Sequence, residues 1–359
     1  MTQALAADPR FQTLDLPDPG RLADADDRRA TEVLDRLERL TMETIQDLGN
    51  NPQLLLDAAG WPAMSVWMGM RKRAIALHPL HTFRAGDRAA LGNGIVPGDL
   101  RRPLVDGADA FAVLAATMGA EVAADTARQY DTFLTTPWDP SLEILFGAHT
   151  DARAIRWRAL AAQRAVLECA AGWTGTPLLV SLGCGAAGAT AELARDLAAH
   201  GSAPAELLLV DHDPVALSAG RTIAERYVDP ASITVQLRGL IDIRARRATA
   251  QIPHVAAGSA HLVDLLGLFE YLPDMMAVDL LAQTRPILRD GGALLVGNML
   301  RQRRGQTSFD HVIQWPRLKQ RTVEEVLCLA ERAGFDTART TVVQPPWTDA
   351  VYAVYVFRA

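Results

Sequence analysis

The amino-acid sequence predicts an α/β fold in which a mostly parallel, doubly wound sheet follows a mostly helical N-terminal region. Two observations support this prediction. Beyond residue 175, short continuous apolar runs alternate with amphipathic segments, which is typical of a parallel sheet covered by helices on both faces. Before that point, apolar residues recur at helical spacing and no alternating strand pattern is visible. We therefore predict a helical region over residues 1–148 and a second domain over residues 149–359.

The N-terminal region combines segments of helical spacing with one stretch rich in glycine, proline and charge, residues 78–103, which we expect to be a loop. The helical segments are 26–49, 62–77, 109–119 and 120–134. A further helix over 149–172 leads into the second domain.

The second domain is predicted to begin with five parallel strands and the helices between them. The strands are 177–183, 206–211, 233–238, 260–267 and 291–299. The helices are 188–199, 214–227 and 273–288. Asp213 followed by Pro214 is explained as the N-cap and first residue of the second of these helices.

The end of the chain departs from this alternation. Thr322 and Glu325 form a capping box that opens a helix over 323–334, which ends at Gly334. Two strand-like runs follow, 337–344 and 349–359, and the turn between them is too short for a crossover. They must therefore pair antiparallel, which completes a predicted sheet of seven strands.

Composition limits the classes of protein to which the chain can belong. Its 359 residues are 49% hydrophobic and 22% charged, as in soluble globular proteins, and the net charge is −6. Nucleic-acid-binding proteins are usually basic, so we expect no nucleic-acid partner. The N-terminus lacks the apolar region of a signal peptide, and no apolar run reaches the roughly 18 residues of a membrane span. We expect a cytoplasmic protein with no membrane partner.

Three cysteines, Cys169, Cys184 and Cys328, lie far apart and form no C-x-x-C pair. This spacing excludes a disulfide framework and a cysteine zinc site, and we expect no metal. Since the sequence places no histidine or lysine to activate Cys184, we expect a buried filler there and not a nucleophile.

A glycine turn follows the first predicted strand of the second domain. Gly183, Gly185 and Gly188 spell G-x-G-x-x-G, which lets the backbone approach a ligand and opens a helix whose N-terminus attracts anions. Asp211 ends the second strand, where its carboxylate can accept both hydrogens of ribose hydroxyls. We expect the partners of Asp211 to be ligand atoms. These features suit either a nicotinamide or flavin dinucleotide or another adenosine cofactor.

Four motifs separate these cofactors. The turn LGCGAAG and the segment LLLVDHDPVAL resemble motifs I and II of the class I S-adenosylmethionine-dependent methyltransferases. DLLGLFEYLPD, residues 264–274, resembles the segment that lines their methyl-donor pocket, and PILRDGGALLVGN resembles their fifth strand. The resemblance covers residues 150–359. It implies a Rossmann-like core that binds S-adenosylmethionine and releases S-adenosylhomocysteine, with the helical N-terminal region as a substrate cover.

A narrower resemblance is to the bacterial methyltransferases of hydroxy fatty acid methyl ester biosynthesis. Those enzymes tend to read GLFDYL, GNF and DW…RT where this chain has GLFEYLP, VGNM and the stretch from Asp310. Glu270 stands in place of their aspartate, and Gln314-Trp315 in place of their Asp-Trp pair. These departures concern the substrate and not the cofactor.

The superfamily resemblance assigns cofactor contacts to the ends of the first four strands. Some residues would lie beneath the methionine part, others would bind the ribose or flank the adenine, and two would lie beside the sulfonium. The assigned residues are Ser181, Gly183, Cys184, Gly185, Gly188, Asp211, His212, Ile241, Asp242, Leu266 and Gly267.

Candidate catalytic residues are Glu270 and Tyr271, at the mouth of the fourth strand. A carboxylate there could act as a base or hold a cationic substrate. The alternative is that Glu270 caps a helix end and Tyr271 packs under the sheet edge. The candidate substrate-binding residues are Tyr130, Trp138, Asn298, Trp315 and Arg321. Alternatives stay open here too, since an arginine before a capped helix is often a surface residue and helically spaced aromatics often form core.

The function predicted from these features is methyl transfer from S-adenosylmethionine to an oxygen or nitrogen atom of a small molecule, such as a specialised metabolite or a carboxylic acid. The first alternative is an NAD(P)-dependent oxidoreductase, although the sequence has no Tyr-x-x-x-Lys pair. The second is a protein that binds S-adenosylmethionine without methylating. The sequence also leaves a homodimer open.

Overall fold

The computed structural model of the chain describes residues 8–13, 150–242, 247–248, 255–301, 303, 318–345 and 350–359. Almost all of these residues belong to one compact unit, which contains residues 157–301 and 318–359 together with an N-terminal segment. The helices predicted before residue 149 lie outside the described residues, so the predicted division of the chain at residue 148 stays a prediction.

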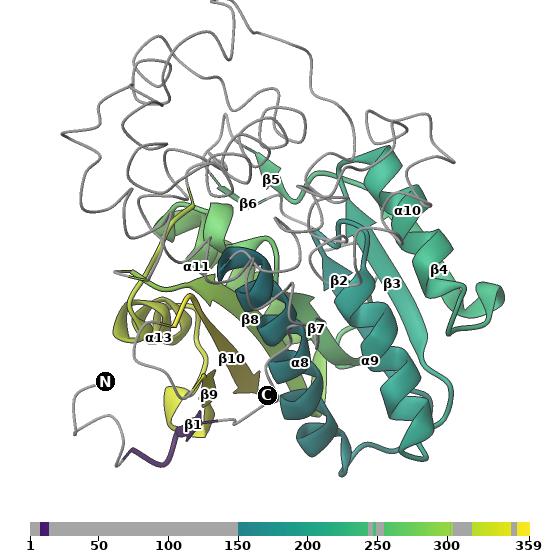
Figure 1. The fold of residues 1–359 in the computed structure, drawn as a ribbon, viewed down its shortest axis with the longest axis horizontal. Coiled ribbons are helices and arrows are strands. Elements are labelled where there is room, and N and C mark those ends of the chain that lie inside the picture. Colours follow the sequence, from purple (N-terminus) through teal and green to yellow (C-terminus); the bar gives the residue numbers. More distant parts are fainter. Residues whose placement is uncertain are drawn as a thin grey trace, which may run out of the picture. The chain divides into compact units, whose positions relative to one another are not determined.

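An eight-stranded sheet forms the centre of this unit (Figure 1). The strands are β1 (Phe11–Thr13), β2 (Leu178–Leu182), β3 (Glu206–Asp211), β4 (Ile233–Leu237), β7 (Ala260–Leu265), β8 (Leu288–Met299), β9 (Thr341–Gln344) and β10 (Tyr352–Arg358). They lie in the order β1-β9-β10-β8-β7-β2-β3-β4. Among these strands, β10 alone runs antiparallel to its neighbours, β8 and β9.

The predicted fold class is confirmed, including the antiparallel hairpin of β9 and β10, but the number of strands is not. The sequence predicts seven strands and none before residue 175. The structure adds β1, which pairs parallel with β9 so that Phe11 lies opposite Val342. A strand of three residues at the edge of a sheet is too short to show an alternating pattern, so the sequence gives no signal for it.

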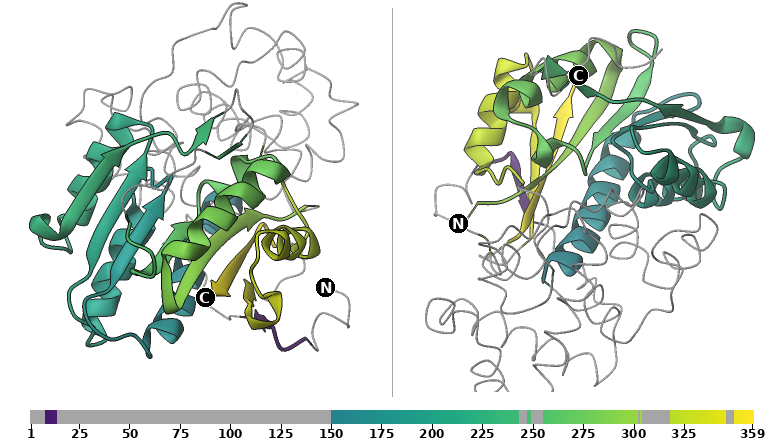
Figure 2. Two further views of the ribbon diagram at one scale, coloured as in Figure 1. Left: turned by 180° about the vertical axis from the view of Figure 1, so that it is seen from behind. Right: turned by 90° about the horizontal axis from the view of Figure 1, so that it is seen from above.

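The helices lie on both faces of the sheet. They are α8 (Thr150–Ala170), α9 (Gly188–Ala199), α10 (Pro214–Ala224), α11 (Asp274–Thr284) and α13 (Val323–Arg332). Figure 2 shows α11 and α13 on one face and α8 on the opposite face. The right-handed crossover rule places α9 and α10 on the opposite face from α11, because the chain moves in one direction from β2 to β4 and in the other from β7 to β8.

Local capping confirms two predicted helix starts. The Asp213 carboxylate accepts hydrogen bonds from the backbone N–H groups of Val215 and Ala216, at 2.9 and 3.1 Å, with proline as the first residue of α10. Thr322 and Glu325 form the predicted capping box at the start of α13. These caps satisfy N–H groups that have no partner within the helix.

A buried histidine joins two strands at the amino-terminal edge of the sheet. His261 is 6% exposed, and its Nδ1 accepts a hydrogen bond from the backbone N–H of Leu178 at 3.1 Å. Its Nε2 lies 3.3 Å from the carbonyl of Thr174. Burial lowers the pKa of the ring, and the nearby Arg289 guanidinium lowers it further. The ring is therefore neutral in the folded state, which leaves Nδ1 able to accept.

We expect the free energy of unfolding to fall as the pH drops below about 6.5, the ordinary histidine value, because the unfolded chain then binds a proton that folded His261 does not. Urea unfolding between pH 8 and pH 5 measures this. His261→Asn retains an acceptor without titrating and should flatten the curve, whereas His200→Gln, at an exposed histidine, should not. A wild-type curve identical to that of His261→Asn would contradict the assignment.

Candidate cofactor and active site

The candidate site lies at the carboxyl ends of β2, β3 and β7. The order of the strands reverses between β2 and β7, since β3 lies on one side of β2 and β7 on the other. In an open α/β sheet, the crevice that binds ligands forms at such a reversal. The glycine turn after β2 and Asp211 at the end of β3 both lie at this place.

The glycine turn has backbone angles that favour glycine. Gly183 and Gly185 have φ values of +66° and +52°, and α9 begins after Ala187, which is also left-handed at φ +53°. A Cβ atom at Gly183 would lie 2.9 Å from the Cβ of Leu268, so a larger residue does not fit. The backbone N–H of Gly183 donates to the carbonyl of Val210 at 2.8 Å, which fixes the turn against β3.

Asp211 holds the turn through its carboxylate. The carboxylate accepts hydrogen bonds from the backbone N–H groups of Gly185, His212 and Asp213, at 2.8, 2.7 and 3.1 Å. Burial opposes ionisation, but the hydrogen bonds from His212, Gly185 and Asp213 outweigh it and lower the pKa of Asp211. The expectation that its partners would be ligand atoms needs correction, because three of them are backbone groups of this chain.

Cys184 lies inside this turn and is not activated. Burial raises the pKa of the Cys184 thiol well above its usual range, and the negative charges of Asp211 and Asp264 add to that effect. Its sulfur lies 3.4 Å from the carbonyl of Gly185. The thiol stays protonated at neutral pH, so it does not offer the thiolate that a nucleophile requires.

A second buried carboxylate lies beneath the turn. Asp264, in β7, is 5% exposed and accepts hydrogen bonds from the hydroxyls of Ser181 and Thr190, at 2.7 and 2.5 Å. It also accepts from the backbone N–H of Leu266 at 2.8 Å. From the sequence, Ser181 is assigned to the cofactor, whereas Asp264 is only the first residue of the segment that resembles the lining of the methyl-donor pocket. The signal that could have identified Asp264 is an aspartate inside a strand that is apolar except for His261 near its start.

Glu270 lies in a network of protein groups. It is 3% exposed, and its Oε1 accepts from the Tyr352 hydroxyl at 3.0 Å and lies 3.4 Å from Nη1 of Arg158. Its Oε2 accepts from the backbone N–H of Met299 at 3.1 Å. Nη1 of Arg158 also donates to the carbonyl of Leu266 at 2.9 Å. Glu270 and Arg158 together therefore connect α8 and β10 to the segment that follows β7.

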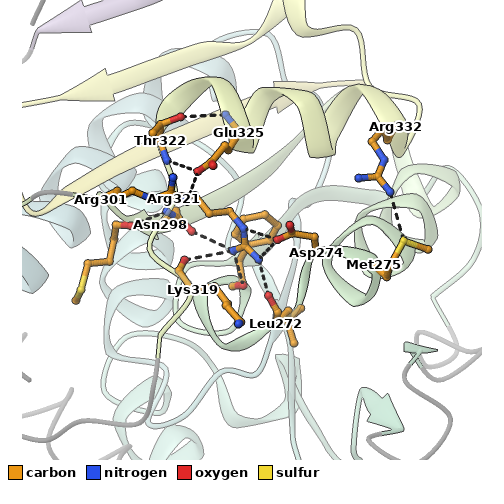
Figure 3. Close-up of polar contacts among 12 residues, drawn as sticks. Leu272, Asp274, Met275, Asn298, Arg301, Lys319, Arg321, Thr322, Glu325 and Arg332 are labelled. Carbon is orange, nitrogen blue, oxygen red and sulfur yellow. Dashed lines mark hydrogen bonds and ion pairs between the residues drawn. The ribbon is translucent and has the colours of Figure 1, made fainter.

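Arg321 forms a similar network with groups around α11 (Figure 3). Its Nε and Nη2 donate to Oδ1 of Asp274 at 3.1 and 2.9 Å, and Nη2 also donates to the carbonyl of Leu272. Its Nη1 lies 3.4 Å from Oδ1 of Asn298. The guanidinium lies over the Phe269 ring, 4.9 Å from its centre. Arg321 is 3% exposed. The two predicted substrate residues, Arg321 and Asn298, therefore contact each other inside the protein.

Comparisons with known proteins show which solved structures share this fold. No model of a protein family matches the sequence, and no curated protein matches it. Solved structures do. The carbon methyltransferase CurJ is 13% identical with a TM-score of 0.50, covering 95% of this chain and 95% of that one. The CMeT domain of the citrinin polyketide synthase is also 13% identical with a TM-score of 0.50, covering 91% and 97%. The chain has the fold of the S-adenosylmethionine-dependent methyltransferases.

A possible exported protein from Bordetella parapertussis is also similar, at 19% identity with a TM-score of 0.50, covering 82% of this chain and 95% of that one. Within the described part of the chain, no helix is long and apolar enough to span a membrane. No group of three or more potential metal ligands occurs among the same residues.

The methyltransferase fold brings most of the predicted cofactor residues to one edge of the sheet. Ile241 and Asp242 form β5 (Ile241–Asp242), which pairs antiparallel with β6 (Arg247–Ala248). The chain reaches β5 from the end of β4, where the N–H of Arg238 donates to the carbonyl of Asp211. Gly188 begins α9, Gly267 is exposed after β7, and Tyr271 is half-buried beside Glu270. Tyr130, Trp138 and Trp315 lie outside the described residues.

Proposed function

We propose that this protein is a methyltransferase that binds S-adenosylmethionine at the glycine turn and methylates an oxygen or nitrogen atom of a small molecule in the cytoplasm. The observation that carries the proposal is the pairing of a left-handed glycine turn with the ionised, buried Asp211 at the strand reversal of a methyltransferase fold. Backbone that approaches a ligand closely, beside a carboxylate that accepts hydrogen bonds, suits the ribose and methionine parts of the cofactor.

The residues present fit this cofactor. The turn excludes a side chain at Gly183, and α10 packs closely behind it, since a Cβ at Gly220 would lie 3.1 Å from the carbonyl oxygen of Gly185. We assign the ribose hydroxyls to Asp211 and the adenine side to His212. When bound, S-adenosylmethionine supplies a sulfonium methyl group that is already activated for displacement. The protein therefore has mainly to align the acceptor, and alignment alone can contribute about 7–11 kcal/mol.

The contacts of the two predicted catalytic residues support different roles. Glu270 accepts hydrogen bonds from Tyr352 and Met299 and faces the Arg158 guanidinium, so we propose that it positions the segment after β7. Tyr271, in the same short 3-10 helix (Phe269–Tyr271), is half-buried and is our candidate for proton transfer with an amine or hydroxyl acceptor. We likewise propose that Arg321 and Asn298 support the substrate side and do not bind substrate directly.

Calorimetric titration of the purified full chain with S-adenosylmethionine, S-adenosylhomocysteine and NAD⁺ tests the proposal. We expect micromolar binding of the first two and none of NAD⁺. Binding of NAD⁺ alone would favour the oxidoreductase alternative and overturn the assignment of the turn. If S-adenosylmethionine binds, transfer of its labelled methyl group to a panel of small acids, alcohols and amines distinguishes an enzyme from a protein that binds the cofactor without methylating.

A further inference from the structure

Asp264 differs from the other buried carboxylates of the described residues in having neutral partners alone. Its hydrogen-bond donors are two hydroxyls and one backbone N–H, from Ser181, Thr190 and Leu266. Glu270, by contrast, faces the Arg158 guanidinium, and Asp211 lies 3.1 Å from a ring nitrogen of His212. Neutral donors stabilise a carboxylate without cancelling its charge, so the field of Asp264 extends into its surroundings.

Two observations place Asp264 close to the glycine turn, where its field acts. Asp264 pairs with Ser181 across the strands, two residues before Gly183. Its Oδ1 also accepts from Leu266, which belongs to the segment assigned to the sulfonium side. In addition, the Asp264 charge contributes to the raised pKa of the Cys184 thiol, so it acts electrostatically on a group inside the turn. Burial strengthens such an interaction, because a low dielectric screens it weakly.

We propose that Asp264 is a specificity-determining residue for the methyl donor, whose negative charge favours the cationic S-adenosylmethionine over the neutral S-adenosylhomocysteine. The proposal rests on the proposed function. Methyl transfer converts the sulfonium into a thioether, so the donor loses the positive charge that Asp264 attracts. Asp264 therefore selects substrate over product at a site that otherwise binds the same adenosine and amino acid groups.

A purely structural role for Asp264 predicts a different result. Asp264 connects β2, the start of α9 and the segment after β7, so loosening it would disturb the whole turn. Such a disturbance weakens both ligands alike, because both carry the same adenosine and methionine-derived groups. The ratio of the two dissociation constants thus separates the electrostatic role from the structural one, whereas either constant alone does not.

The test is calorimetric titration of wild type and Asp264→Asn with S-adenosylmethionine and S-adenosylhomocysteine. We expect the preference for S-adenosylmethionine to fall about tenfold in Asp264→Asn, equivalent to 1.4 kcal/mol. Thr190→Val is the matched control, since it removes a hydroxyl from the same network and leaves the charge. Its preference should stay at the wild-type value or rise. An unchanged ratio in Asp264→Asn, or an equal fall in Thr190→Val, would overturn the proposal.

A measurement on the wild type covers the case in which Asp264→Asn does not fold. In sinefungin a carbon that bears an ammonium group replaces the sulfonium sulfur and its methyl group. It should therefore bind about tenfold more tightly than S-adenosylhomocysteine, and equal affinities contradict the proposal. Failure of the proposed function is distinguishable from failure of this inference. Wild type that binds none of the three ligands contradicts the function, while wild type that binds all three with no preference for the cations contradicts the role of Asp264 alone.

Discussion

Asp211→Ala is expected to weaken binding of both S-adenosylmethionine and S-adenosylhomocysteine by about 100-fold or more. Hydrogen bonds to a charged group contribute about 1.5–3 kcal/mol each, and the carboxylate, which has about four acceptor sites and uses three for backbone N–H groups, keeps one for a ribose hydroxyl. The substitution also removes the acceptor of the Gly185 N–H, so the turn itself loosens. The loss should therefore exceed that of the ribose contact alone.

Calorimetry of both ligands measures this loss, and Asp213→Ala is the matched control. Asp213 lies two residues further along and caps α10, so its removal should cost about 1 kcal/mol of stability but leave ligand affinity close to that of wild type. Asp211→Ala with unchanged affinity would mean that the ribose is bound elsewhere. Equal losses of affinity in both variants would mean that the effect passes through α10.

The largest expected effect on stability is that of breaking the buried pair of Arg158 and Glu270. Glu270→Ala leaves Arg158, a residue that is 6% exposed, without its carboxylate partner, and removing one partner of such a pair costs about 3–5 kcal/mol. The double variant Arg158→Met, Glu270→Met should lose less than Glu270→Ala, because no unpaired charge stays buried. Met299 and Tyr352 would also lose the acceptor that Glu270 gives them.

Urea unfolding of the single and double variants checks this expectation. Glu225→Ala is the control, since Glu225 pairs with Arg221 at 2.8 Å on the surface of α10, where an ion pair contributes about 1 kcal/mol or less. Turnover gives the second measurement. A Glu270→Gln variant that folds like wild type but loses about 100-fold or more in kcat at unchanged KM would restore Glu270 as a general base and contradict its positioning role.

Much of the fold is predictable from the sequence because its signals are local. The residues of α9 were predicted with the same bounds as observed, 188–199, because a glycine turn marks the start and apolar spacing marks the length. The capping box before α13 depends on residues only three apart. One exception is β1, which forms only because it pairs with β9, a strand more than 300 positions away in the sequence.

The candidate site is less predictable, because the partners of its charged residues are remote in sequence. Arg158 and Glu270 are 112 residues apart, and Arg321 and Asp274 are 47 apart. From the sequence, Glu270 and Arg321 are therefore candidates for contact with a substrate, and the alternatives of a helix cap and a surface arginine stay open. Glycine patterns and strand ends locate a crevice, whereas the destination of a guanidinium depends on which strands become neighbours.

The position of β10 has a consequence for the order in which the chain folds. Because β10 lies between β8 and β9, the strands β9 and β1 can join the sheet only through it. Pairing of Phe11–Thr13 with β9 closes a loop of more than 300 residues, whose entropic cost is offset only after the neighbouring strands have formed. We therefore expect β1, although it is synthesised first, to join the sheet only after β10 and β9 have formed.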